Sequence, residues 1–223
     1  MTVIAMAIAS CRAGPEPLRQ RGATLVYVLC LLVVVLLLGV SAAQMALQGE
    51  KAARGERDRH IAFQAAEEAL HDAQNDIEGL PGAPGRSSLF APDSAAGFLD
   101  GCGEAGSGQL GLCLAAAKGM PPPWLAMALD APDGASGNRF VPHGHYTGAA
   151  MQTGQGYLPF RRPRYLIELL PFHAPGEEAG TPEGKLLNPS YLYRITAIGF
   201  GAQESTQVVL QSYYRKAAAG AGP

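Results

Sequence analysis

The sequence predicts an α+β protein in which a long N-terminal α-helix packs on a C-terminal antiparallel β-sheet. Three observations predict this class. One apolar run lies near the start of the chain, an amphipathic stretch without proline follows it, and alternating β-rich segments appear only near the end. The 223 residues are enough for one domain of ordinary size with an extension.

The apolar run extends from Ala23 to Leu47, and its only clearly polar side chains are Thr24, Tyr27, Ser41 and Gln44. A helix of this length rises roughly 37 Å, enough to cross a hydrocarbon core about 30 Å thick. In lipid a single segment must be helical, because only a helix satisfies its own backbone groups. We therefore predict a transmembrane helix over residues 23–47.

Two familiar kinds of N-terminal segment fit this run. In a secretory signal peptide, Arg19 and Arg21 would be the basic region and Val40 to Ala42 the cleavage site, although the apolar stretch is long for a signal core. An uncut membrane anchor fits as well, and basic residues on both sides of the run leave its orientation open. Neither interpretation assigns a role to Gly22, which lies between the basic residues and the apolar run.

Residues 48–78 predict an amphipathic continuation of the same helix, ending at Gly79 and Pro81. A break at Gly49 or Gly55 is the alternative. An apolar stripe with three-four spacing is expected to pack on the rest of the protein: Phe63, Ala66, Leu70, Ala73 and Ile77. The acidic side chains off this stripe are expected to form a solvated face: Glu67, Glu68, Asp72 and Asp76.

Residues 79–162 are rich in glycine and proline. They predict the irregular part of a globular head on which the helix packs, with a helical turn or two over Leu112–Gly119. Cys102 and Cys113 lie close together in this part. If it is exported, they are the natural disulfide pair, worth roughly 2 to 3 kcal/mol. Two free thiols are the alternative.

Residues 163–216 predict the antiparallel sheet. Its strands are expected over Pro163–Pro171, Tyr191–Gly201 and Thr206–Lys216, and the last two form a hairpin. A long exposed connection separates the first strand from the hairpin. Residues 217–223 are expected to be a disordered tail.

No motif predicts catalysis. The chain lacks G-x-S-x-G, P-loop, H-E-x-x-H and dinucleotide-binding patterns, so no enzyme activity and no cofactor are expected. The net charge of -2 and the dispersed basic residues argue against a nucleic-acid partner. His143 and His145 have the spacing of two metal ligands on a strand, but no third ligand is identifiable nearby. We expect a solvated loop and no metal.

The residues around Gly22 resemble the leader of type IV prepilins. "QRG" followed by "ATLVYVLCLLVVVLLLG" is similar to the site where a membrane peptidase cuts after the glycine. The resemblance implies a leader over 1–22, cleavage between Gly22 and Ala23, and N-methylation of Ala23. Thr24 and Leu25 match the family's T-L pair. Two departures are Ala23, where the family usually has Phe, and Tyr27, where it usually has Glu.

The stretch "GEKAARGERDRHIAFQAAEEALHDAQ" is similar to the segment that follows the membrane helix in PilX-type minor pilins, and the resemblance covers about Arg19 to Gln74. It implies a pilin-like fold and a role in priming or capping a type IV pilus, in twitching motility and in adhesion. The implied location is the inner membrane, crossed once with the head in the periplasm, and then the pilus at the cell surface. The implied partners are the major pilin and other minor pilins, the prepilin peptidase and methyltransferase, the inner-membrane assembly platform and the lipid bilayer.

Two features of the membrane helix bear on assembly. Gly39 and Ala43 form a small face that suits close helix contacts. In the resembling family the glutamate at the position of Tyr27 neutralises an N-terminal amine in the filament, and an unpaired buried charge is unfavourable. We therefore expect this subunit at the tip or in the priming complex. The alternatives are a type II secretion pseudopilin and a single-pass membrane protein whose periplasmic head binds a partner without polymerising.

Overall fold

A computed structural model describes residues 23–82, 85–132, 137–154, 156–172 and 190–217. The chain divides into two compact units, Met1–Lys51 and Ala52–Pro223, and the second is called the head below. Three predicted segments lie outside the described residues, wholly or for the most part. They are the leader over 1–22, the connection after Phe172 and the tail after Ala217.

The first element, α1, is one continuous helix over Ala23–Glu78. It passes Gly49 and Gly55 without a break, because no proline removes a backbone hydrogen bond. The helix ends where Gly79 adopts a left-handed conformation with φ of 82°. There the N–H of Gly79 donates to the carbonyl of Asn75 at 2.8 Å, a common way to satisfy the last carbonyls of a helix.

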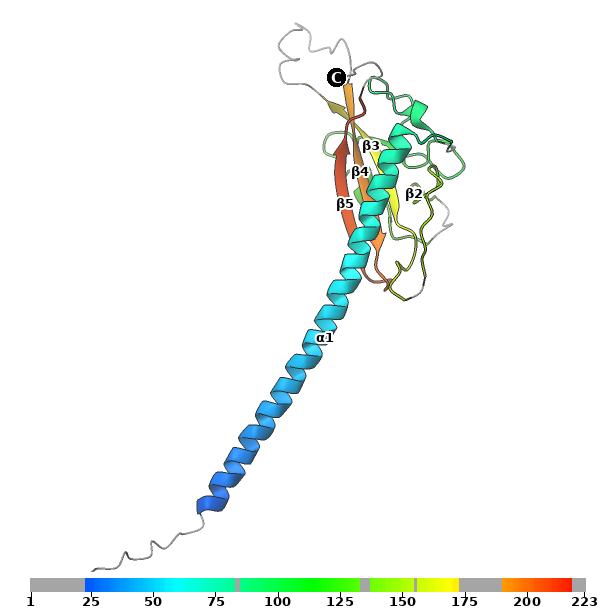
Figure 1. The fold of residues 1–223 in the computed structure, drawn as a ribbon. Helices are drawn as coiled ribbons and strands as arrows, with labels where there is room; N and C mark the ends of the chain where they lie inside the picture. Colours follow the sequence, from blue (N-terminus) through cyan, green and yellow to red (C-terminus); the bar gives the residue numbers. More distant parts are fainter. Residues whose placement is uncertain (1–22, 83–84, 133–136, 155, 173–189, 218–223) are drawn as a thin grey trace, which may run out of the picture. The chain divides into compact units, whose positions relative to one another are not determined.

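The head contains a mixed five-stranded sheet (Figure 1). Its strands are β1 (Leu112–Leu114), β2 (Val141–Pro142), β3 (Arg164–Phe172), β4 (Ser190–Phe200) and β5 (Gln207–Tyr214). The order is β1-β3-β4-β5, and β2 also pairs with β3. The pairs β3–β4 and β4–β5 are antiparallel, whereas β1 is parallel to β3. The predicted α+β class is confirmed, and the strands within residues 163–216 are antiparallel as predicted; the difference is the parallel pair that β1 adds from the irregular part of the head.

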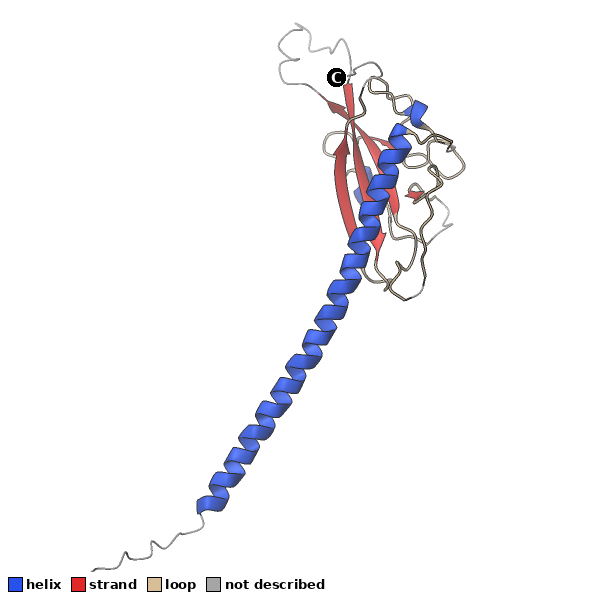
Figure 2. Cartoon of the chain, in the orientation of Figure 1, coloured by secondary structure: helices blue, strands red, loops and turns tan. Residues whose placement is uncertain are grey.

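Strand β1 accounts for that difference. It occupies the start of Leu112–Gly119, where a helical turn was expected. Leu112 and Cys113 are fully buried, and Ile167 donates its backbone N–H to Gly111 at 2.8 Å. These tertiary contacts override a local preference for helix. Around β1 and β2 the chain between α1 and β3 is mostly loops and turns (Figure 2), with one 3-10 turn (Ser87–Leu89) and the short helix α2 (Pro123–Ala126).

Residues 52–78 of α1 lie across one face of β3, β4 and β5 (Figure 1). The buried side of the helix is made mainly of alanines: Ala62, Ala65, Ala66, Ala69 and Ala73, with Ile77 at the end. These small side chains allow a close approach to Gly199 on β4. A Cβ at Gly199 would lie 2.1 Å from the carbonyl oxygen of Ala62 and 2.3 Å from the backbone nitrogen of Ala66.

The predicted apolar stripe is therefore only partly correct. Ala66, Ala73 and Ile77 are fully buried and Leu70 is partly buried. Phe63 is 38% exposed, so its predicted packing on the head is wrong. The helix turns its alanine side to the sheet, about 100° from the direction of Phe63, because alanine permits the close contact with Gly199.

Both faces of the sheet are covered over part of their length. On the face toward α1, the core includes Tyr165, Ile167, Tyr193 and Ile195. On the other face, a second cluster joins Leu166, Ile198 and Phe200 to the irregular part of the head through Cys102, Cys113, Leu129 and Phe140. The irregular residues therefore supply much of the second core layer.

Candidate functional site

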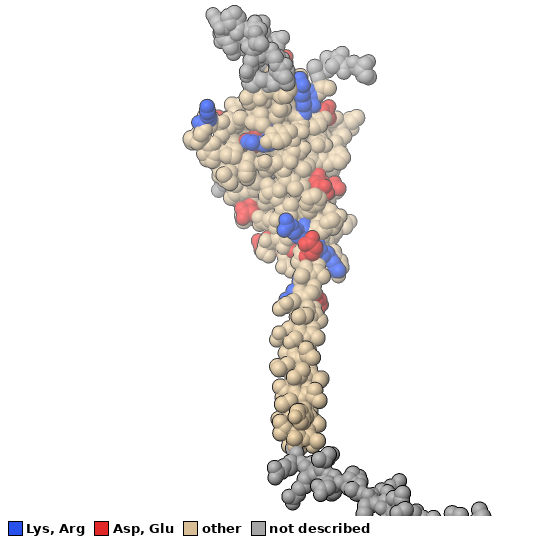
Figure 3. Space-filling model, turned by 90° about the vertical axis from the view of Figure 1, so that its left-hand side faces the viewer, with Lys and Arg blue, Asp and Glu red and all other residues tan. Residues whose placement is uncertain are grey.

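The N-terminal part of α1 is the first candidate site. From Ala23 to Gly49 it carries no Lys, Arg, Asp or Glu, and both kinds of charge begin at Glu50 and Lys51 (Figure 3). Every side chain from Ala23 to Lys51 is exposed. Among the described residues α1 is the one helix long and apolar enough to cross a membrane. Such a surface is unstable in water and requires lipid or protein to cover it.

The predicted assembly residues all lie on this exposed part of α1. Thr24, Leu25 and Tyr27 are in its first two turns, and Tyr27 is 70% exposed. Gly39 and Ala43 lie one turn apart, and a Cβ at Gly39 would meet no atom within 4 Å. The predicted cleavage residue Gly22 lies outside the described residues, directly before the first residue of α1.

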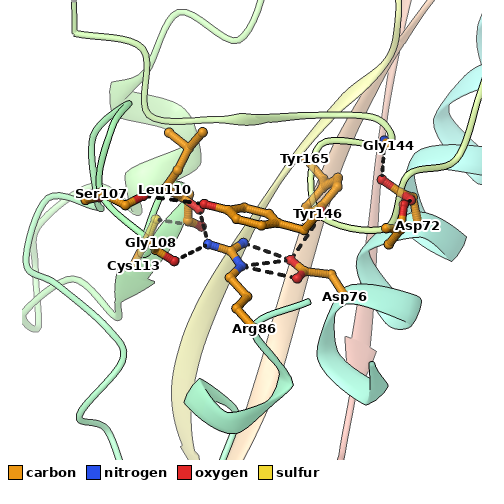
Figure 4. Close-up of polar contacts among 12 residues, drawn as sticks. Asp72, Asp76, Arg86, Ser107, Gly108, Leu110, Cys113, Gly144, Tyr146 and Tyr165 are labelled. Carbon is orange, nitrogen blue, oxygen red and sulfur yellow. Dashed lines mark hydrogen bonds and ion pairs between the residues drawn. The ribbon is translucent and has the colours of Figure 1, made fainter. Parts of the chain in front are cut away.

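A buried ion pair joins α1 to the irregular part of the head (Figure 4). The guanidinium of Arg86 binds Asp76 through Nη2 at 2.8 Å, with side-chain exposures of 6% and 0%. Arg86 also donates to the Leu110 carbonyl at 2.6 Å, and Tyr165 donates its hydroxyl to Asp76 at 3.1 Å. The ring centroid of Tyr146 lies 3.8 Å from the guanidinium carbon. Residues from α1, β3 and the chain around Leu110 and Tyr146 therefore meet at the Asp76–Arg86 ion pair.

The electrostatics of this cluster follow from its burial. Desolvation raises the pKa of Asp76 above the ordinary carboxyl value, while Arg86 and the Tyr165 hydroxyl act in the opposite direction. Burial next to Asp76 raises the pKa of Tyr165 well above the ordinary phenol value. Asp76, Arg86 and Tyr165 are all buried, so the cluster holds a fixed geometry.

Two further aspartates of α1 bind loops of the head. Asp72 accepts the backbone N–H of Gly144 at 2.8 Å and the hydroxyl of Thr147. Asp58 accepts the N–H groups of Ala202 and Gln203, in the turn between β4 and β5, at 2.5 and 3.2 Å.

The prediction that these acidic side chains of α1 are solvated is therefore wrong for Asp72 and Asp76, which are buried. Glu67 and Glu68 are exposed, as predicted. The two aspartates share the buried side with the alanines because loops from the irregular part offer them N–H and O–H donors. Asp58 and Arg86 lie in no recognisable sequence motif, so their contacts could not be predicted from the sequence.

The predicted disulfide between Cys102 and Cys113 is confirmed. It closes a loop that contains Leu110, the residue whose carbonyl accepts from Arg86. The bond thus fixes one side of the buried cluster to β1.

Breaking this disulfide is expected to lower the free energy of unfolding by about 2 to 3 kcal/mol, because the bond reduces the conformational entropy of the unfolded chain. The test is denaturant unfolding of the full chain in detergent with Cys102 and Cys113 both replaced by serine. Cys30→Ser, in the exposed apolar segment, is the matched control. Equal unfolding midpoints for the double variant and wild type would contradict the prediction.

His143 and His145 do not form a metal site with other described residues. His143 is buried, at 4% exposed, whereas His145 is exposed and contacts the ring of Tyr146. Both lie in the turn that follows strand β2, and not on a strand as the predicted spacing required. Within the described part of the chain, no three histidine, cysteine, aspartate or glutamate side chains are placed to hold a metal ion.

Comparison with known families identifies the chain. A model described as PilX N-terminal matches residues 21–70, and one described as type IV pilus assembly protein PilX C-term matches residues 109–216. Together the two matches cover more than half of the chain. The chain belongs to the PilX family. No curated protein and no solved structure matches it.

Family membership makes the chain a PilX-type minor pilin of a type IV pilus. The N-terminal match contains the apolar segment and the start of the alanine face, and the C-terminal match contains all five strands. Asp76, Arg86 and Cys102 lie between the two matched ranges. The Asp76–Arg86 ion pair therefore lies outside both matched ranges, whereas Leu110, Tyr146 and Tyr165 of the buried cluster lie within the C-terminal match.

The alkaline stability of the head follows from its buried tyrosines. Burial raises the pKa of Tyr193 to about 12, whereas a phenol in the unfolded chain titrates near 10. Between about pH 10 and 12 the folded state keeps this proton and the unfolded state loses it. Stability present below pH 10 is therefore lost as the pH rises through 12, by about 2 to 3 kcal/mol for this residue.

Denaturant unfolding of the full chain at pH 9 and pH 11 measures this loss. Tyr193→Phe removes the titrating group and should make the fall in stability between the two pH values smaller. An equal fall in the variant and the wild type would contradict the assignment.

Proposed function

We propose that this PilX-type pilin is processed after Gly22, held in the inner membrane by the Ala23–Leu47 segment with its head in the periplasm, and then assembled at the tip or in the priming complex of the pilus. The observation that carries the proposal is the long exposed segment of α1 without a charged side chain. In the membrane, lipid covers this surface. In a filament, the helices of neighbouring pilins take the place of lipid, and Gly39 allows them to approach closely.

The proposed place in the filament depends on Tyr27. Cleavage after Gly22 leaves a charged amine on Ala23, one helical turn before Tyr27. A buried amine needs a carboxylate partner, and a tyrosine offers a hydrogen bond without a charge. A subunit that cannot neutralise a neighbour's amine suits a position where one axial neighbour is absent.

Immunogold labelling of pili tests this position. Label at one end of the filament is expected, together with loss of surface pili when the protein is deleted. Label spread evenly along the shaft would contradict the tip position. In the variant Tyr27→Glu the carboxylate is restored, and we expect label to appear within the shaft as well.

Two alternatives predict different results. If the protein is a type II secretion pseudopilin, its deletion should abolish secretion and leave surface pili intact. A membrane protein that never polymerises would keep its leader and be absent from purified pili. PilX membership favours the pilus over both.

A further inference from the structure

The disulfide between Cys102 and Cys113 lies inside the second core cluster of the head. Cys102 is 4% exposed and Cys113 is fully buried. They share this cluster with Leu166 on β3 and with Phe200 at the end of β4. Thiol–disulfide exchange requires a thiolate to reach a sulfur atom directly. The bond can therefore be formed or reduced only while this cluster is open.

The loop that this bond closes supplies the acceptors of Arg86 (Figure 4). Nη1 of Arg86 donates to the carbonyl of Leu110 at 2.6 Å and to that of Gly108 at 3.3 Å. The ring of Tyr146 lies against the guanidinium, and its hydroxyl donates to the carbonyl of Ser107 at 3.4 Å. All three carbonyls therefore belong to residues between the two cysteines.

Two features make the conformation of this loop depend on the bond. Four of the ten residues between the cysteines are glycine, so the loop gains much conformational entropy when it opens. Among the described residues, Cys102 is the one non-glycine residue in a left-handed conformation, with φ of 71°. Residues with a Cβ rarely adopt this conformation. The reduced loop therefore relaxes, and its three acceptor carbonyls move with it.

We propose that oxidation of Cys102 and Cys113 controls the closure of the head onto the end of α1. In the dithiol form Arg86 loses its loop acceptors, and a buried guanidinium with unpaired N–H groups is unfavourable. Arg86 then turns to solvent, and Asp76 on α1 loses its partner. Oxidation joins the two Sγ atoms, while two protons and two electrons pass to the disulfide of an oxidant, which becomes a dithiol. The chain thus stays open at this end of α1 in a reducing compartment and closes in an oxidising one.

Trypsin cleavage of the full chain in detergent tests this closure, because Arg86 is 6% exposed and Arg164, within β3, is fully buried. The chain is refolded without an oxidant, and the initial rate of cleavage after each arginine is measured by mass spectrometry. In the dithiol chain, cleavage after Arg86 should be at least about tenfold faster than after Arg164, since only the loop and its contacts open. Oxidised glutathione added after refolding should make Arg86 as resistant as Arg164.

Two variants accompany the wild type. Cys30→Ser, in the exposed apolar segment, is the matched control and should respond to the oxidant as the wild type does. The double variant C102S/C113S should stay open at Arg86 whether or not the oxidant is present. Reduction of the oxidised wild type by dithiothreitol, followed with a maleimide, should be at least about a hundredfold slower without denaturant than with it.

Three results would overturn the proposal. The first is a dithiol chain in which Arg86 resists trypsin as well as it does in the oxidised chain. The second is equally fast cleavage after Arg86 and Arg164, because the bond then holds the whole head together and does not control one contact. The third is reduction at the same rate with and without denaturant, which would place the sulfur atoms within reach of a thiol in the closed head.

Discussion

Replacing Gly199 by valine is expected to separate α1 from the sheet and unfold the head. Even the first side-chain carbon at this position would lie 2.1 Å from the Ala62 carbonyl oxygen and 2.3 Å from the Ala66 nitrogen. Both are backbone atoms and cannot rotate away, so the helix would have to move. Overpacking of a core usually lowers stability by about 1 to 3 kcal/mol, and a clash with backbone should reach about 3 kcal/mol or more.

Thermal unfolding of the full chain in detergent, followed by circular dichroism, measures this effect. Gly55→Ala is the matched control, because a Cβ at Gly55 meets nothing within 4 Å and the residue lies on the same helix. Alanine there should raise stability by about 0.5 to 1 kcal/mol. A Gly199→Val variant as stable as wild type would show that the helix does not rest on β4 as described.

The second large effect is expected from Asp76→Asn. The amide has nearly the volume of the carboxyl group but no charge, so Arg86 is left as a buried cation without its partner. Breaking a buried ion pair in this way typically lowers the free energy of unfolding by about 3 to 5 kcal/mol. Loss of the Arg86 contacts should also free the loop that carries Leu110.

Denaturant unfolding at neutral pH compares this variant with two others. Asp76→Leu combined with Arg86→Met removes both charges and should regain much of the loss, since no charge then remains buried. Glu68→Gln, an exposed acid on the same helix, is the control and should change stability by less than about 0.5 kcal/mol. A decrease below about 1 kcal/mol for Asp76→Asn would contradict the described ion pair.

Much of the fold could be predicted because its signals are local. The apolar run and the proline-free stretch after it predict α1, and the alternation within residues 163–216 predicts β3, β4 and β5. The disulfide was also foreseeable, since Cys102 and Cys113 are close in sequence. Each of these features depends on neighbouring residues alone.

The contacts between α1 and the head could not be predicted in the same way. An aspartate on a helix usually faces solvent, and nothing near Asp72 or Asp76 in sequence reveals the loop donors that bury them. Phe63 was misplaced because apolar periodicity favours large side chains, whereas the structure places alanines against Gly199. Strand β1 was missed because three residues carry too little alternation to be recognised.

The mass and N-terminal sequence of the protein in purified pili test the central claim most directly. Processing as a pilin predicts a mature chain that begins with N-methylated Ala23 and retains the whole of α1. A chain that begins at Ala43, or one that keeps the residues before Gly22, would contradict the account.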